Sequence, residues 1–347
     1  MADVARLAGV SHQTVSRVVN GHPNVRAATV ERVRRAIEET GYRRNSTARA
    51  LATSRTNVLG VIASETALYG PAQTLVGIER AAREAGYFLT VVSLDHTSRD
   101  SAAEAVDHLI QQSVEGCVAI TPQRRLAERL TAPDAPRPLV MVEGGEDWGL
   151  PVVCVDQAQG AAEAVEHLLG LGHRTVHHIE GNPLWPQSRA RLAGWRRALA
   201  GAGAPAPATL HGDWSPRSGY EQGRALLARR AAGEPVTAVF VGNDQMAVGV
   251  LRALGEARLD VPGDVSVVGF DDVPEAEFLS PALTTVRQDF ARVGQESLSL
   301  LLQQVGGADT APRADLRRMV PARLLPRGSS GPAPAPDVRD NPRKETS

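Results

Sequence analysis

The chain has 347 residues, 42% of them hydrophobic and 22% charged, which suits two or three folded domains with cores of ordinary size. No apolar run approaches the roughly 20 residues of a transmembrane helix, and the N-terminus lacks the pattern of a secretory signal, so we expect a cytoplasmic protein without a membrane partner. The net charge of −1 is unevenly distributed along the chain. Residues 1–57 carry ten arginines and four acidic residues, while the remainder carries 28 basic and 35 acidic residues. The N-terminal segment is therefore basic and suited to binding a polyanion.

The stretch from Val4 to Gly21 has the pattern of a helix-turn-helix. Gly9 breaks a short apolar-faced turn, and Ser11 can cap the helix that follows. Val15 and Val18 fall on one face of that helix, and polar residues fall on the other. In a helix-turn-helix the second helix enters the major groove, where Gln pairs with adenine and Arg with guanine. By itself, the same pattern also fits a small helical hairpin with a solvated face.

The segment from Asp3 to Asn20, DVARLAGVSHQTVSRVVN, resembles the opening of the lactose-repressor family of bacterial transcription regulators. The resemblance implies that this head binds double-stranded operator DNA through a set of residues in and beside the second helix. These residues are His12, Gln13, Thr14, Ser16, Arg17 and Asn20. Because His12 replaces a tyrosine of the member that gives the family its name, we expect a different operator sequence.

A third helix, Ala27–Thr40, should close the head, with Gly41 as its C-terminal stop. Its predicted buried stripe is Val30, Val33 and Ile37. Arg26 occupies the N-cap position, where family members usually have Ser, so this cap is weaker or is supplied by Thr29.

The segment Asn45–Ser54, NSTARALATS, is too short and too poor in large apolar residues to be a stable helix alone, and a plain linker is one interpretation. The resemblance implies instead a hinge helix over 45–56 that folds only on DNA. In that arrangement Leu51 enters the minor groove as a wedge and kinks the duplex.

From Asn57 onward, buried-strand runs alternate with helical stretches, which predicts parallel sheets with helices on both faces. The predicted fold is therefore an N-terminal all-α helix-turn-helix head, residues 1–44, followed by an α/β core of two parallel-sheet subdomains over 57–326. The resemblance implies a periplasmic-binding-protein-like core with a ligand cleft. We expect an N-subdomain of about 57–155 and 286–311 and a C-subdomain of about 156–285 and 312–326.

The tail, residues 327–347, is rich in Pro and polar residues and should be disordered. It has no leucine heptads of the kind that make tetramers, so we predict a homodimer. Cys117 and Cys154 lie in apolar strand-like runs and should be buried free thiols rather than a disulfide or a metal site.

Polar residues recur at the carboxyl ends of the predicted strands, where open parallel sheets bind ligands. From these positions and from motif matches to the family, the predicted ligand-binding residues are Ser64, Glu143, Arg191, Trp214, Asn243, Asp271 and Gln288. Taken singly, Asn243 or Asp271 could simply cap the following helix. Trp195 fits a core position, and neither Trp148 nor Trp185 has an assigned place.

Together these side chains suit a neutral sugar, because carboxylates, an arginine and an amide can grip hydroxyl groups while Trp214 covers an apolar face. No phosphate-binding loop and no nucleophile–base pair is evident, so we expect no enzyme activity and no cofactor or metal. The resemblance implies a repressor released from DNA by a sugar, with a β-galactoside favoured, although Glu143 replaces an Asp and Val155 an aromatic residue. The alternatives are another sugar, a corepressor, or a sugar-binding protein without a regulatory role.

Overall fold

The computed structural model describes residues 1–19, 21–42, 55–94, 101–120, 128–130, 138–143, 150–305 and 317–335. The chain divides into two compact units, Met1–Thr56 and Asn57–Ser347. The predicted DNA contacts Asn20 and Leu51 lie outside the described residues, as does the predicted hinge Asn45–Ser54. Within the described part, no helix is both long and apolar enough to cross a membrane.

The described part of the N-terminal unit contains three helices: α1 (Ala2–Ala8), α2 (His12–Val19) and α3 (Ala27–Thr40). Gly9 ends α1 in the left-handed conformation, φ 62°, which costs a glycine little. The hydroxyl of Ser11 accepts a hydrogen bond from the amide of Thr14 at 3.1 Å, so the predicted cap of α2 is present. Arg26 makes no side-chain cap to α3.

The core of this unit is small and joins all three helices. Its buried members are Val4, Ala8, Val15, Val33 and Ala36. Of the stripe predicted on α3, Val33 is fully buried and Ile37 packs at the edge of the core. Val30 is only half-buried, and the small side chain of Ala36 lies in the core instead, where α1 and α3 pack closely.

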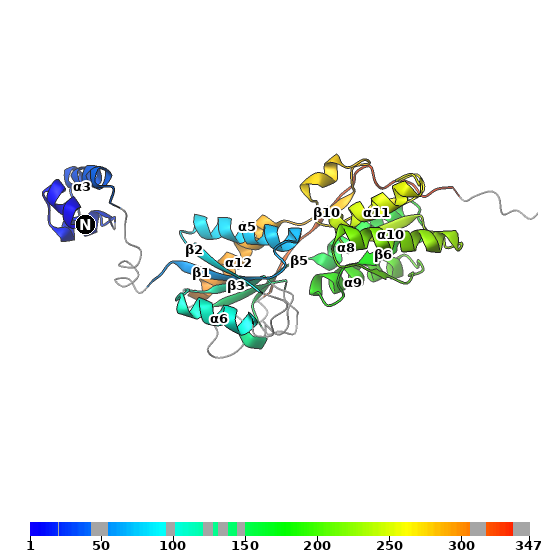
Figure 1. Ribbon diagram of the computed structural model, residues 1–347, viewed down its shortest axis with the longest axis horizontal. Helices are drawn as coiled ribbons and strands as arrows, with labels where there is room; N and C mark the ends of the chain where they lie inside the picture. The colour runs from blue at the N-terminus through cyan, green and yellow to red at the C-terminus, as the bar shows by residue number, and fades with distance from the viewer. Residues whose placement is uncertain are drawn as a thin grey trace, which may run out of the picture. The chain divides into compact units, whose positions relative to one another are not determined.

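The first subdomain of the second unit is a six-stranded parallel sheet in the order β11-β5-β4-β3-β1-β2. Its strands are β1 (Val58–Ala63), β2 (Phe88–Ser93), β3 (Cys117–Ile120), β4 (Leu139–Val142), β5 (Val152–Val155) and β11 (Arg317–Val320). The helices α5 (Tyr69–Glu84) and α12 (Phe290–Val305) pack together on one face, and α6 (Ser101–Gln111) lies on the other (Figure 1). Both sheet faces are therefore covered, which explains the nearly continuous apolar strands.

Along β1, successive side chains enter opposite cores, as the period of two requires: Val61 joins the core under α5 and α12, and Ile62 joins the core under α6. Cys117 in β3 and Cys154 in β5 are free and buried, as predicted. Burial raises the pKa of each thiol to about 12, so neither is a nucleophile at neutral pH.

The second subdomain is a four-stranded parallel sheet in the order β7-β6-β8-β9. Its strands are β6 (His177–Glu180), β7 (Leu210–His211), β8 (Ala238–Val241) and β9 (Ser266–Val268). One face carries α8 (Gln157–Gly170) and α9 (Pro186–Gly201), and the other carries α10 (Pro216–Ala231) and α11 (Asp244–Glu256). A 3-10 helix, η2 (Pro274–Phe278), follows β9.

Three connections join the subdomains. The first is at Asp156, between β5 and α8, and the second follows β10 (Thr285–Arg287). The third was predicted near Ala311, and that prediction is wrong: β11 still pairs with β5 in the first sheet, so the chain crosses only after Val320. It then forms β12 (Arg323–Leu325), which pairs antiparallel with β10.

Disorder was predicted from residue 327 onward, and this starting point is too early in the chain. Residues 327–335 pack on the second subdomain, and Ser329 is fully buried, with its hydroxyl donating to the carbonyl of Val267 at 2.6 Å. Arg327 pairs with Asp272 at 2.6 Å. These long-range contacts could not be predicted from the segment's composition, which is rich in Pro and polar residues. Residues 336–347 lie outside the described part of the chain.

Candidate functional site

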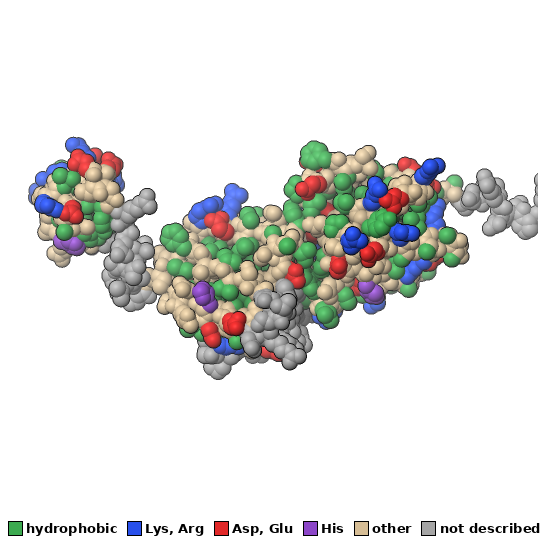
Figure 2. All heavy atoms as spheres, in the orientation of Figure 1, with side chains coloured by type: hydrophobic (Ala, Val, Ile, Leu, Met, Phe, Trp, Pro, Cys, Tyr) green, Lys and Arg blue, Asp and Glu red, His purple; other side chains and the backbone are tan. Residues whose placement is uncertain are grey.

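The head presents a polar helix face of the kind that meets nucleic acid. His12, Gln13 and Arg17 of α2 are exposed, and Thr14 and Ser16 are partly exposed, while Val15 on the opposite face is completely buried. Basic side chains and a histidine are visible at the surface of this unit (Figure 2). The structure thus leaves the predicted base-reading side chains free of the core.

A cavity lies between the two subdomains, and all seven predicted ligand-binding residues line it. Ser64 follows β1 and Glu143 follows β4, so both come from the first subdomain. Arg191 on α9, Trp214 before α10 and Asn243 before α11 come from the second. Asp271 follows β9, and Gln288 follows β10. The empty volume is about 700 Å³, which includes space open to solvent.

Three of the seven residues have a backbone conformation that L-residues rarely adopt. The φ angle is 58° at Glu143, 77° at Trp214 and 121° at Asp271. Such conformations cost about 1–3 kcal/mol each and persist where the surroundings hold them. Their gathering around one cavity is typical of a functional site, because strained residues concentrate where side chains must point at a ligand.

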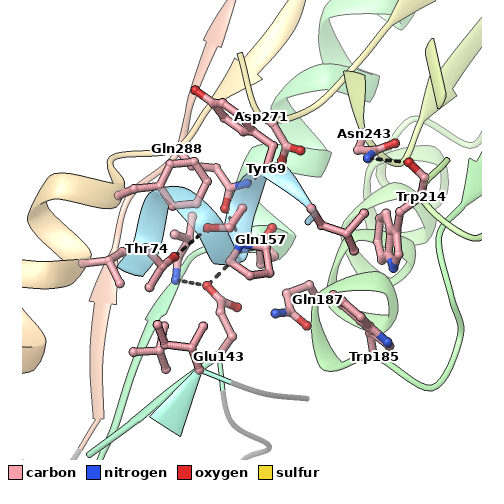
Figure 3. A pocket seen from close by; sticks show the side chains of 18 of the residues that line it. Tyr69, Thr74, Glu143, Gln157, Trp185, Gln187, Trp214, Asn243, Asp271 and Gln288 are labelled. Carbon is pink, nitrogen blue, oxygen red and sulfur yellow. Dashed lines mark hydrogen bonds between the residues drawn. The ribbon is translucent and has the colours of Figure 1, made fainter. Parts of the chain in front are cut away.

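Polar side chains of the cavity form a ring of three hydrogen bonds closed by one ion pair; Figure 3 labels its members Gln157, Gln288 and Asp271. Arg191 Nε donates to Gln157 Oε1 at 2.8 Å, and Gln157 Nε2 donates to Gln288 Oε1 at 2.9 Å. Gln288 Nε2 donates to Asp271 Oδ1 at 2.6 Å, and Arg191 Nη2 lies 3.6 Å from the same oxygen. Gln157 Nε2 also lies 3.2 Å from Glu143 Oε1, which ties the ring to the first subdomain.

Buried aromatic and acidic groups hold this ring in place. The guanidinium of Arg191 lies 3.8 Å from the centre of the Phe270 ring, a cation–π contact. Asp244 is fully buried and fixes the loop after β9, accepting from the hydroxyl of Thr285 at 2.6 Å and from the amide of Val273 at 2.9 Å. Asp271 is therefore presented by a rigid loop.

Asn243 has the structural role that its position predicts and lines the cavity as well. Its Oδ1 caps α11 by accepting from the amide of Met246 at 3.0 Å. Its Nδ2 donates to the carbonyl of Trp214 at 3.1 Å, which fixes the loop that carries the indole. Capping and cavity lining are thus compatible at this residue.

The carboxyl groups of the cavity are poorly solvated. Burial raises the pKa of Asp271 to about 7, although nearby Arg191 acts to lower it. Burial likewise raises the pKa of Glu143 to about 6, against the hydrogen bond from the amide of Val155. Arg191 is the only cation among the described residues of the lining. The cavity therefore lacks the surplus positive charge that a phosphate would need.

Three buried polar atoms of the lining have no hydrogen-bond partner among the described residues. They are Ser64 Oγ, Gln187 Oε1 and the indole Nε1 of Trp214. Ser64 is 2% exposed and Trp214 6% exposed, so both are almost completely enclosed by protein. A buried polar group without a partner costs about 1–3 kcal/mol, so these atoms mark places where a ligand with hydroxyl groups gains hydrogen bonds.

The sequence did not assign Gln157, Tyr69, Trp185 or Gln187, which also line the cavity. Gln157 comes directly after Asp156 at the end of β5, so the strand-end rule could have found it. Trp195 is a core residue, 1% exposed, as its position on an apolar helix face predicted. Trp148 lies outside the described residues.

Comparisons with known proteins agree with this architecture. Residues 1–45 match the family "Bacterial regulatory proteins, lacI family", and residues 165–330 match "Periplasmic binding protein-like domain". The chain is 36% identical over 304 residues to the lactose operon repressor of Escherichia coli (strain K12), which covers 87% of this chain and 83% of that protein.

Solved structures give the same likeness. A crystal structure of the lac repressor dimer bound to operator and the anti-inducer ONPF has a TM-score of 0.84 and 34% identity, covering 95% of this chain and 98% of that one. A complex of the transcriptional regulator CelR with cellobiose has a TM-score of 0.72 and 31% identity, covering 94% and 98% of the two chains.

Proposed function

The chain belongs to the lacI family of bacterial regulatory proteins, and from this premise we propose that it is a repressor that leaves its operator when a β-galactoside enters the cleft. As a member of this family it is a transcriptional regulator and not an enzyme. The operator, the sugar and the sign of the response are parts of the proposal.

One observation carries the proposal: side chains far apart in the sequence meet in one cavity as a set that suits a sugar. Arg191 and Asp271 lie side by side in the cavity, and a guanidinium and a carboxylate can pair with neighbouring hydroxyls of a pyranose. Trp214 offers an apolar surface beside them. Because one arginine stands among carboxyl groups with raised pKa values, a neutral ligand is favoured over an anion.

The galactoside is favoured because the lactose operon repressor is similar over most of both chains. The CelR–cellobiose complex is also similar and contains a different sugar. A second candidate is therefore a repressor of the same construction that responds to a glucoside. Glu143 supports this second candidate, because its side chain is longer than that of the Asp which it replaces.

On the DNA side, we propose that His12, Gln13 and Arg17 read base edges, with Thr14 and Ser16 as further contacts. A homodimer would present two heads to a near-palindromic operator. The lac repressor bound to its operator is a dimer, which supports this arrangement. The wedge at Leu51 and the contact of Asn20 belong to the same proposal.

Release from DNA by a sugar requires that the sugar bind the DNA-releasing arrangement more tightly than the DNA-binding one. Couplings of this kind are typically about 1–3 kcal/mol, or roughly 5- to 150-fold in operator affinity. A ligand that bound the DNA-binding arrangement more tightly would act as a corepressor instead. The two signs give opposite results in the same titration.

The test is an operator-binding titration of the full chain against galactosides, glucosides, pentoses and purines. A labelled near-palindromic DNA reports binding by fluorescence anisotropy, with Asp271→Ala and the head variant Arg17→Ala measured in parallel. We expect β-galactosides to dissociate the native protein from the DNA. Asp271→Ala should bind the DNA and should not be released by the sugar. A purine response without any sugar response would overturn the ligand assignment, and tightening by galactosides would reverse its sign.

A further inference from the structure

Two adjacent carboxylates in the loop after β9 have separate partners. Asp271 lines the cavity and contacts Gln288 and Arg191, whereas Asp272 is not part of the lining. Both residues have a positive φ angle, 121° at Asp271 and 55° at Asp272. Aspartate tolerates such angles better than most residues, but two in succession cost free energy that nearby contacts must offset. The loop that presents Asp271 therefore depends on contacts outside the cavity.

The carboxylate of Asp272 is held between two arginines. Arg287 Nε donates to Asp272 Oδ2 at 2.6 Å, and Arg327 Nη2 donates to Asp272 Oδ1 at 2.6 Å. The side chain of Asp272 is 9% exposed and that of Arg327 is 18% exposed, whereas that of Arg287 is 57% exposed. Because water weakens ion pairs, the pair with Arg327 is the stronger of the two. We call Asp272, Arg287 and Arg327 the aspartate clamp.

The two arginines of the aspartate clamp come from the segments that join the subdomains. Arg287 ends β10, and Arg327 follows β12, which pairs antiparallel with β10. The guanidinium of Arg327 is itself fixed, since Nη1 donates to the carbonyl of Leu283 at 2.8 Å. The amide of Asp271 donates to the carbonyl of Val286 at 2.8 Å, one residue before Arg287. The clamp thus ties the loop of Asp271 to two of the three connections.

We propose that Asp272 is a positioning residue of the effector site, and that Arg327 and Arg287 hold it in that role. The aspartate clamp fixes the loop so that the carboxylate of Asp271 meets the ligand, while Asp272 itself makes no ligand contact. This inference rests on the proposed function, because it takes Asp271 as a contact of the effector. The segment after β12 thereby controls effector affinity from outside the cavity, through Arg327.

Positioning differs from a general contribution to stability in the way that its effect combines with that of Asp271. If Asp272 acts through Asp271, removing both carboxylates should cost no more sugar affinity than removing that of Asp271 alone. If Asp272 only stabilises the second subdomain, the two losses should add. A double-mutant cycle therefore separates the two roles.

The experiment is titration of the full-length protein with methyl β-galactoside and with cellobiose, followed by calorimetry or, for weak binding, by tryptophan fluorescence at high sugar concentration. The variants are Asp272→Asn, Asp271→Asn and the double variant, because Asn keeps the tolerance for positive φ and removes the charge. The matched control is Glu296→Gln. Glu296 is also a carboxylate between two arginines, Arg292 and Arg318, and it lies outside the cavity lining.

We expect Asp272→Asn to weaken binding of the sugar by roughly 3- to 30-fold, the range of coupling within one network of contacts. Arg327→Met should cause a similar loss and Arg287→Met a smaller one, because Arg287 is the more exposed partner. Asp272→Asn should cause no further loss once Asp271 is Asn, and Glu296→Gln should leave the affinity unchanged. Native affinity in Asp272→Asn, or additive losses in the double variant, would overturn the positioning role and leave the proposed function intact.

A second measurement needs no sugar. In the ligand-free protein, hydrogen exchange at the amides of Asp271 and Val273 should be faster in Asp272→Asn, because these amides bond to Val286 and Asp244 within the loop that the clamp holds. Unchanged exchange there, or faster exchange spread over the whole second subdomain, would overturn the clamp. If neither sugar bound the native protein, the proposed ligand class would be refuted, and exchange at these two amides would still decide the role of Asp272.

Discussion

Replacing Gly181 with alanine should disable the sugar site by displacing Trp214. Gly181 follows β6, and a Cβ added there would lie 2.1 Å from Cη2 of the Trp214 ring and 2.2 Å from Cζ2 and Cζ3. Ordinary contact begins at 3.4 Å, so the ring must move by about 1.3 Å. The loop of Trp214 is held by Asn243, so we expect the ring to move into the cavity.

Overpacking of this kind costs about 1–3 kcal/mol of stability. A ring displaced by more than 1 Å loses most of its close contacts with a stacked sugar, because dispersion contacts are short-ranged. We therefore expect a loss of sugar affinity of about 10- to 100-fold, which corresponds to roughly 1.4–2.8 kcal/mol. Operator affinity without sugar should be unchanged, since the head is a separate compact unit.

The assay is calorimetry with the sugar that releases the native protein from DNA, together with thermal unfolding and operator binding. Gly170→Ala is the matched control, because Gly170 ends α8 and an added Cβ there meets no atom within 4 Å. This control should bind the sugar normally. If Gly181→Ala bound the sugar with native affinity, the position assigned to Trp214 in the complex would be wrong.

Further predictions concern the head, the hinge, the cleft carboxyl and the tail. Arg17→Ala should reduce discrimination at one base step by about 1–3 kcal/mol, and unchanged specificity in a competition assay would contradict its place in the groove. Leu51→Ala should weaken operator binding more than non-specific binding, whereas equal losses would make Asn45–Ser54 a linker. Burial raises the pKa of Asp271 from 3.8 to about 7, so its contribution to stability, present at low pH, should fall as the pH rises between these values. Urea unfolding of the native protein and of Asp271→Asn at pH 5 and pH 8 tests this. If the free energy of unfolding of the native protein, relative to that of the variant, did not decrease from pH 5 to pH 8, the raised pKa of Asp271 would be contradicted. Truncation after residue 335 should leave the melting temperature unchanged. Truncation after residue 326 removes buried Ser329 and should lower the melting temperature by several degrees. Equal melting temperatures for the two truncated proteins would refute the packing role of residues 327–335.

Much of the cleft could be predicted because parallel sheets have a simple geometry. Strand ends meet at one edge of a sheet, so polar residues directly after buried strands are brought together whatever lies between them. Glu143 and Asp271 follow this rule, and so does Gln157, which the sequence analysis passed over. Trp185 and Gln187 lie at the β6–α9 junction, where the direction of each side chain depends on the loop backbone and on long-range packing.

Two errors have a common physical cause. The strand Arg317–Val320 has alternating exposure and little intrinsic preference, so its partner β5 decides which sheet it joins. The segment from Arg327 has the composition of a disordered tail, yet Arg327 pairs with Asp272 and Ser329 bonds to Val267. In both cases, contacts with residues distant in the sequence outweigh local composition.

The distribution of cleft residues between the subdomains bears on how a sugar can control DNA. A ligand held only by Arg191, Trp214 and their neighbours on the second subdomain would bind equally well whatever the position of the first, and would shift no equilibrium. The first subdomain contributes Ser64 and Glu143 to the lining, together with residues of α5 such as Tyr69 and Thr74. Ser64 directly follows β1, and β1 begins two residues after the end of the head unit in the sequence. Within the sheet, β1 is paired with β2 on one side and with β3 on the other. A strand so confined cannot move alone, so a contact at Ser64 acts on the whole first subdomain. We infer that the tightness of binding comes mainly from the second subdomain, whereas the coupling to DNA depends on contacts between the ligand and the lining of the first, Ser64 and Glu143 among them.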